Sequence, residues 1–128
     1  MSADLITVAR STKYAVDAFV FVQRGLDFTV RRIHGEPGAE DEPGSRHVSG
    51  QQLCVGLRDY AVEQYGLMAR TALRHWHVLG SEDFGHIVFA MVDAGLMAKT
   101  DDDTIRDFAG ALDFSRDFTA ELEISGNA

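Results

Sequence analysis

Apolar side chains recur every three or four residues along most of this chain, which is the spacing of one face of a helix. Ser11 or Thr12 offers an N-cap oxygen for the first long helix. Gly25 either weakens that helix by about 1 kcal/mol or lets another helix approach closely. A strand over residues 28–33 is the alternative for its last part, and a shorter helix is expected over residues 3–10. The long stripe, from residue 14 to about residue 33, comprises Tyr14, Ala18, Phe21, Val22, Leu26 and Thr29.

Two later helices have clear start and stop signals. Ser49 and Gln52 match a capping box, Val48 and Leu53 are placed as a hydrophobic staple, and Gly66 suits the residue just after the helix. The second begins with Ser81 as its expected N-cap and ends at Gly95, and its buried face comprises Phe84, Ile87, Val88, Met91 and Val92. Between them a core helix is expected over residues 67–76, with one apolar side made of Leu67, Met68, Thr71, Ala72 and Trp76.

The residues after Gly95 resemble the wing of a winged helix-turn-helix. Residues 96–99 and 105–108 fit short strands around an acidic turn, although Thr104 could instead cap a short helix. We therefore predict a mostly α, single compact helical domain over residues 1–128, winged-helix-like, with a small two-stranded wing at 96–108. Ser115 is expected to cap a last short helix. The remaining segments are expected to be irregular: a flexible acidic Pro/Gly loop at 35–46 and a frayed tail at 125–128.

The charge distribution argues against a DNA reader. The length of 128 residues, with 45% hydrophobic and 25% charged residues, is ordinary for one soluble domain. Basic and acidic residues balance over residues 1–79, so residues 80–128 carry the whole net charge of −8. The helix in the recognition position contains Glu82, Asp83 and Asp93 and no Lys or Arg, whereas contacts to phosphate supply most non-specific nucleic-acid affinity. The order of elements thus predicts the shape of a winged helix without the charge to read DNA.

The single cysteine and the chain start favour a reducing cytoplasm. Cys54 lies among Leu53, Val55 and Leu57, which predicts an inert thiol in a helix core. The first ten residues do not form a signal peptide, and no run approaches the length that spans a bilayer. We expect a cytoplasmic protein that makes no contact with membrane.

No motif predicts an enzyme, a metal site or a cofactor. The five histidines lack metal-ligand spacing, and no nucleophile elbow, phosphate loop or dinucleotide fingerprint occurs. The acids at 101–103 lack the alternating ligands of a calcium loop. The expected set of catalytic, cofactor-binding and metal-ligating residues is therefore empty.

One cluster of cations suggests a partner. Arg70 and Arg74 are four positions apart, where like charges repel and an anion would relieve them. Arg31, Arg32 and His77 could extend this candidate interaction face, or the cations could pair with the acidic C-terminal half. The leading hypothesis is a non-enzymatic protein-interaction module that binds another protein. A nucleic-acid or ribosome-associated accessory factor using the basic face is the alternative, and an enzyme with an unfamiliar site is the third.

Several runs resemble a known family. They are residues 47–53 (HVSGQQL), residues 65–70 (YGLMAR) with Trp76, and residues 81–89 (SEDFGHIVF) with residues 94–96, together with Tyr14, Ala15, Ala18, Phe19, Val22 and Leu26. These resemble the Minf-type family of small uncharacterised bacterial proteins over roughly residues 14–118, apart from the loop. The resemblance implies the extent of the domain and a bacterial source, and no activity. A glycine is expected after Trp76, where this chain has His77, so the tightness of that turn is in question. Trp76 is expected to anchor the core, the alternative being a half-exposed interface residue.

Overall fold

The protein is mostly α-helical. The computed structural model describes residues 4–36, 38, 47–97, 108–114 and 116–118. Within these residues there are five α-helices, one short 3₁₀ helix and no strand. The helices, in chain order, are α1 (Leu5–Arg10), α2 (Val16–His34), α3 (Gly50–Tyr65), η1 (Gly66–Met68), α4 (Ala69–His75) and α5 (Ser81–Asp93). The prediction of a mostly α domain is confirmed, and α2 is a helix throughout rather than ending in a strand.

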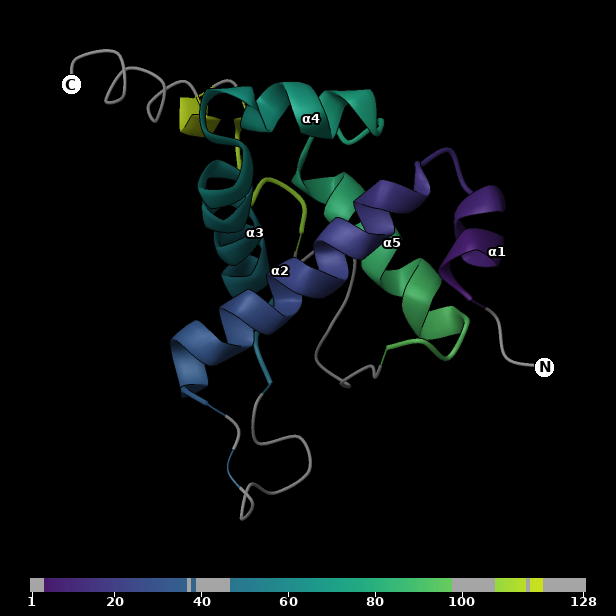
Figure 1. Ribbon diagram of the computed structural model, residues 1–128, viewed down its shortest axis with the longest axis horizontal. Coiled ribbons are helices and arrows are strands. Elements are labelled where there is room, and N and C mark those ends of the chain that lie inside the picture. Colours follow the sequence, from purple (N-terminus) through teal and green to yellow (C-terminus); the bar gives the residue numbers. More distant parts are fainter. Residues whose placement is uncertain (1–3, 37, 39–46, 98–107, 115, 119–128) are drawn as a thin grey trace.

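The long helix α2 lies at the centre of the arrangement. It crosses the molecule diagonally in Figure 1 and packs against α1, α3 and α5. Helix α3 also contacts α5 and α4, and η1 turns the chain from α3 into α4. One hydrophobic core joins all five α-helices with the segment at 108–118, and its fully buried members include Phe19, Val22, Leu57, Leu73, Phe84, Ile87, Met91 and Phe108.

Two glycines set the distance between α2 and α3. A Cβ atom added at Gly56 would lie 1.9 Å from Oγ1 of Thr29, and one at Gly25 would lie 2.3 Å from Cδ2 of Leu57. Both distances are far below contact, so a side chain at either position would have to displace Leu57 or Thr29. The buried hydroxyl of Thr29 donates to the carbonyl oxygen of Gly25 at 2.7 Å, so it is satisfied within the crossing. The close approach expected at Gly25 is therefore confirmed.

The N-cap of α3 agrees with the sequence signals, whereas the start of α2 does not. Ser49 Oγ accepts from the Gln52 amide at 3.0 Å, and Gln52 Oε1 accepts from the Ser49 amide at 2.8 Å, so the capping box is formed. The N-cap of α2 is Ala15, without a side-chain hydrogen bond. Thr12 instead accepts from the Tyr14 amide and donates to the Ala9 carbonyl, which fixes the preceding turn.

The predicted apolar side of the helix over 67–76 is wrong. Residues 66–68 form the 3₁₀ helix η1, and Leu67 and Met68 are each 57% exposed. The buried positions of α4 are Ala69 and Leu73, followed by Trp76. A 3₁₀ turn has about 3.0 residues where an α turn has 3.6, so the helix enters α4 with its face rotated from the expected phase. Trp76 is 9% exposed, and its placement in the core is confirmed.

Ser81 is a buried link rather than the N-cap of α5. Gly80 is the N-cap, and the amides of Leu79 and Gly80 donate to the carboxylate of Asp83 at 2.8 and 3.2 Å. The Ser81 hydroxyl donates to the Phe108 carbonyl and accepts from the Leu112 amide at 3.3 Å. Both bonds span about thirty residues of sequence. Ser81 therefore ties the C-terminal segment to the first turn of α5.

Several predicted features lie outside the described residues. The wing at 96–108 is described only at its ends, and Phe108 there forms part of a turn. Most of the loop at 35–46 and all of the tail at 125–128 also lie outside them. The last helical turn begins at Phe114, with Asp113 as an acceptor for the Arg116 amide, so it starts earlier than a Ser115 cap implies. Among the described residues, no helix has the length and hydropathy needed to cross a membrane.

Candidate functional site

The arginines at the end of α2 are paired within the protein. Arg31 forms ion pairs with Asp27 at 3.0 Å and with Glu36 at 2.9 Å. Arg32 pairs with Asp59 of α3 at 2.7 Å, and its guanidinium lies 5.2 Å from the centroid of the Phe28 ring. The acids come from α2, α3 and the residues just after α2, rather than from the acidic C-terminal half.

The other members of the candidate interaction face lie elsewhere. Arg70 is half-buried on α4, whereas Arg74, also on α4, and His77 just after it are exposed. Helix α4 and the last turn of α2 lie at opposite ends of the view in Figure 1. The structure thus places Arg31 and Arg32 in one group and Arg70, Arg74 and His77 in another, and does not join them in one surface.

His77 has a left-handed backbone conformation. Its φ is +69°, which makes it the one non-glycine residue with positive φ among the described residues. Its amide donates to the Arg74 carbonyl, and the Val78 amide donates to the Leu73 carbonyl, both at 2.9 Å. These two bonds form a Schellman motif, whose left-handed position is usually glycine. The turn after Trp76 is therefore as tight as a glycine would make it, at the cost of strain in a histidine.

A groove between α2 and α3 is the candidate functional site. It consists of two adjacent hollows of about 440 Å³ and about 310 Å³. The larger hollow lies around Phe28 and the smaller around Phe21, and both are bordered by Arg24 and Tyr60. The remaining lining residues are Gln23, Asp27 and Arg31 in the larger hollow, and Asp17, Val20, Gln64, Tyr65 and Trp76 in the smaller one.

Aromatic rings form the floor and wall of this groove. Tyr60 stands between Phe28 and Phe21, with ring centroids 5.3 and 5.5 Å apart. Phe21 continues to Trp76 at 5.6 Å, and Tyr65 meets the Trp76 ring edge-on at 5.7 Å. Contacts of this kind add about 0.5–1.5 kcal/mol each beyond burial, so the wall is held firmly.

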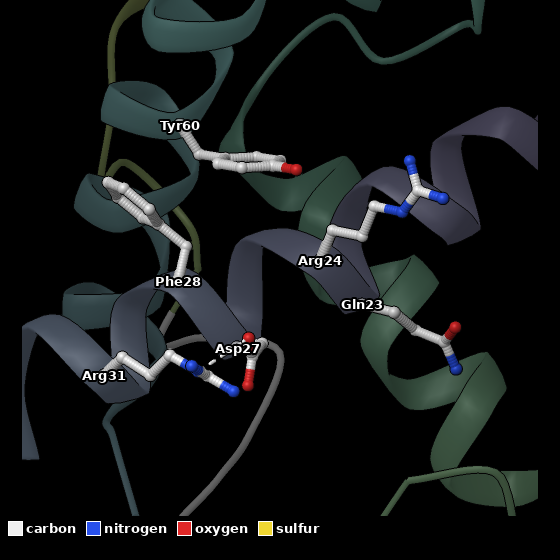
Figure 2. Close-up of a pocket in the computed structure, with 6 residues that line it drawn as sticks. All are labelled: Gln23, Arg24, Asp27, Phe28, Arg31 and Tyr60. Carbon is white, nitrogen blue, oxygen red and sulfur yellow. Dashed lines mark ion pairs between the residues drawn. The ribbon is translucent and has the colours of Figure 1, made fainter. Parts of the chain in front are cut away.

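Arg24 lies on the rim where the two hollows meet. Figure 2 shows Arg31 turned to Asp27, whereas the Arg24 side chain extends away from that ion pair on the same side as the hydroxyl of Tyr60. Arg24 is exposed and forms no ion pair or hydrogen bond with any residue that the structure describes. The phenol oxygen of Tyr60 likewise has no hydrogen-bond partner within that part of the chain. The larger hollow therefore combines an apolar wall with a cation and a hydroxyl that are available to a ligand.

The thiol of Cys54 and the hydrogen bond between Tyr14 and Asp83 belong to the core and do not form a functional site. Burial raises the pKa of the Cys54 thiol to about 12, so it stays protonated and unreactive, as predicted for a core cysteine. Tyr14 donates to Asp83 at 2.5 Å, and burial, that hydrogen bond and the negative charge raise the pKa of Tyr14 above its usual value. This bond ties the turn before α2 to the first turn of α5. In the described part of the chain, no three His, Cys, Asp or Glu side chains come together as a metal site would need.

The sequence did not point to the groove. Phe21 belongs to the apolar stripe, but Phe28 and Tyr60 are half-buried, and their pairing depends on how α2 and α3 cross. Asp27 is the one acid three or four positions from Arg24, and it pairs with Arg31. An arginine left without an intrahelical partner was the only available signal.

Comparisons with protein-family models, with curated proteins and with solved structures each give no match. The resemblance to the Minf-type family stays a prediction.

Proposed function

We propose that this protein is a protein-interaction module and that its contact surface is the groove between α2 and α3. The observation that carries the proposal is the pair of half-buried rings of Phe28 and Tyr60, whose centroids lie 5.3 Å apart in the larger hollow beside the available guanidinium of Arg24. Tyr, Trp, Phe and Arg are the residues enriched at the centres of protein interfaces, where a few of them supply most of the binding energy.

The shape of the groove fits a macromolecule better than a small substrate. Small-molecule sites enclose most of their ligand, whereas the larger hollow lies open along the side of α2. A partner that extends over both hollows would contact more surface than either one alone provides. This favours a protein partner over an enzymatic role, which was the third hypothesis.

A nucleic-acid accessory role has less support. It depended on Arg31, Arg32, Arg70 and Arg74 acting together, but the first two are paired with Asp27, Glu36 and Asp59. The other two lie at the opposite end of the molecule. Separated and partly neutralised cations contribute fewer phosphate contacts than one continuous basic surface.

Site-specific photo-crosslinking in the native host tests the proposal. A benzophenone side chain placed at Gln23, in the groove, is expected to give discrete protein adducts. The same group at Glu82, exposed on α5, serves as the matched control, and at Met68, exposed on η1, it tests a different surface. Adducts from Met68 alone would move the contact to another face. Adducts sensitive to nuclease, or none from Gln23 and Met68, would refute a protein-interaction role.

A further inference from the structure

We propose that the ion pair between Arg32 and Asp59 positions the Phe28 ring for the partner protein. Arg32 then contributes to binding through this ring rather than through a contact of its own. The inference rests on the proposed function and adds two residues beside the groove that act on it. Arg32, one of the candidate contact residues, is in this role a positioning residue.

An aromatic ring and a guanidinium both lie against Phe28 at the larger hollow. The Phe28 ring is half-buried, its centroid lies 5.3 Å from that of Tyr60, and the guanidinium carbon of Arg32 lies over it at 5.2 Å. Arg32 is four positions after Phe28 on α2, so both side chains lie on the same face of that helix. A planar guanidinium is attracted to the face of an aromatic ring. Loss of this guanidinium therefore leaves the Phe28 ring freer to adopt other rotamers.

Asp59 holds the Arg32 guanidinium in place. Nη1 of Arg32 lies 2.7 Å from Oδ2 of Asp59, and Nε of Arg58 lies 2.6 Å from Oδ1 of the same carboxylate. Asp59 precedes Tyr60 on α3, so an ion pair and a ring pair join the same short stretches of α2 and α3. The guanidinium over Phe28 is therefore fixed by the helix that also supplies the Tyr60 ring.

The position and charge of Arg32 favour an indirect role. Of the described residues, Phe28 borders the larger hollow and Arg32 borders neither. The charge of Arg32 is paired with Asp59, whereas the guanidinium of Arg24 is available to a partner. The Arg32 side chain is 41% exposed, and ion pairs with this exposure contribute little to stability. The pair is therefore expected to matter for the ring at the contact surface more than for the fold.

Fluorine NMR of the whole protein tests whether the ion pair positions the ring. A para-fluorophenylalanine placed at position 28 alone gives one signal, which is compared in wild type, Arg32→Gln and Asp59→Asn. Both variants are expected to shift this signal towards its position in the unfolded chain. The double variant is expected to shift it no further, because the two residues act as one unit. Arg116→Gln, which removes another exposed arginine from an ion pair, is the matched control and is expected to leave the signal unchanged.

Crosslinking from Gln23 tests whether the position of the ring matters for the partner. The adduct yield from the benzophenone at Gln23 is expected to fall about two- to tenfold in Arg32→Gln and in Asp59→Asn. This is roughly the factor that corresponds to ordering one side chain on binding. The yield is expected to stay unchanged in Arg116→Gln.

Each remaining outcome contradicts the inference at a different step. An unchanged fluorine signal in both variants would overturn the positioning, and a shifted signal with an unchanged adduct yield would overturn its role in binding. A lower yield in Arg32→Gln alone would show that Arg32 contacts the partner directly. A fall in melting temperature of more than about 4 °C in either variant would show that the pair is structural. If wild-type protein gives no adduct from Gln23, the proposed function fails, whereas the fluorine signals decide separately whether the pair holds the ring.

Discussion

Replacing His77 with glycine should stabilise this protein, although it removes a side chain. His77 occupies the left-handed position of the Schellman motif that ends α4, with φ at +69°. This conformation costs a residue with a Cβ roughly 1–2 kcal/mol, because Cβ approaches the following carbonyl oxygen. Glycine avoids that cost, but a glycine has more conformational freedom in the unfolded chain, which lowers the stability of the folded protein by about 0.5–1 kcal/mol. Since the His77 side chain is exposed, little packing is lost, and the net gain should be roughly 0.5–1 kcal/mol.

Urea denaturation followed by circular dichroism measures this gain. A stabilisation of about 1 kcal/mol corresponds to a rise of roughly 4 °C in melting temperature for a domain of this size. His77→Asn should give an intermediate gain, because asparagine tolerates the left-handed region better than most residues. His77→Ala should give none, since alanine keeps the Cβ.

A second histidine provides the matched control. His75 lies in the last turn of α4 with an ordinary helical conformation, so His75→Gly should destabilise by up to about 1 kcal/mol. The argument is refuted if His77→Gly and His75→Gly change the free energy of unfolding in the same direction. It is also refuted if His77→Ala stabilises as much as His77→Gly, because loss of the imidazole would then be the cause.

Three further substitutions test other contacts. Gly56→Ala should destabilise the fold by about 1–3 kcal/mol, because the new Cβ would lie 1.9 Å from Thr29 Oγ1. A smaller loss of stability in the Thr29→Ala background would show that this contact is the cause, and additive losses would contradict it. Ser81→Ala should lower the free energy of unfolding by about 1–3 kcal/mol, because the Phe108 carbonyl and the Leu112 amide both lose a partner. Amide hydrogen exchange at Leu112 should become faster, and unchanged protection there would count against the link. The pKa of Cys54 rises from 9.0 to about 12 on folding, so the unfolded chain loses that proton first and stability should fall as the pH rises above about 9. Unfolding measured at pH 8 and pH 10 should show a smaller decline in Cys54→Ala, and an equal decline would exclude the thiol as its source.

Sequence reasoning succeeded where the determining interactions are local. The capping box at Ser49 and Gln52 and the apolar spacing of α2 involve residues within a few positions of one another. The buried face of α5 was predicted for the same reason, and Gly95, with φ at +77°, ends that helix as expected.

It failed where a contact depends on distant residues or on the phase of a turn. Ser81 has the sequence context of a cap, but Phe108 and Leu112, about thirty residues later, take its hydroxyl. The face of α4 was misplaced because η1 shifts the helical phase by part of a turn. The candidate basic face required the basic residues of α2 and α4 to lie side by side. Arg32 instead pairs with Asp59, which is 27 positions away in the sequence, so helical spacing could not predict this partner.

The crossing at Gly25 and Gly56 also has a consequence for recognition. The Cβ position at Gly25 lies 2.3 Å from Cδ2 of Leu57, so the missing methyl group lets Leu57 pack directly on α2 and brings Tyr60, three positions further along α3, against the same helix. Because each helix packs a side chain of the other over a glycine, the rings of Phe28 and Tyr60 are held in place in the free protein; under the proposed function, binding would then cost little ordering of this surface. The specificity of such a surface could change through Arg24 and Phe28 alone, while the crossing that shapes it stays the same.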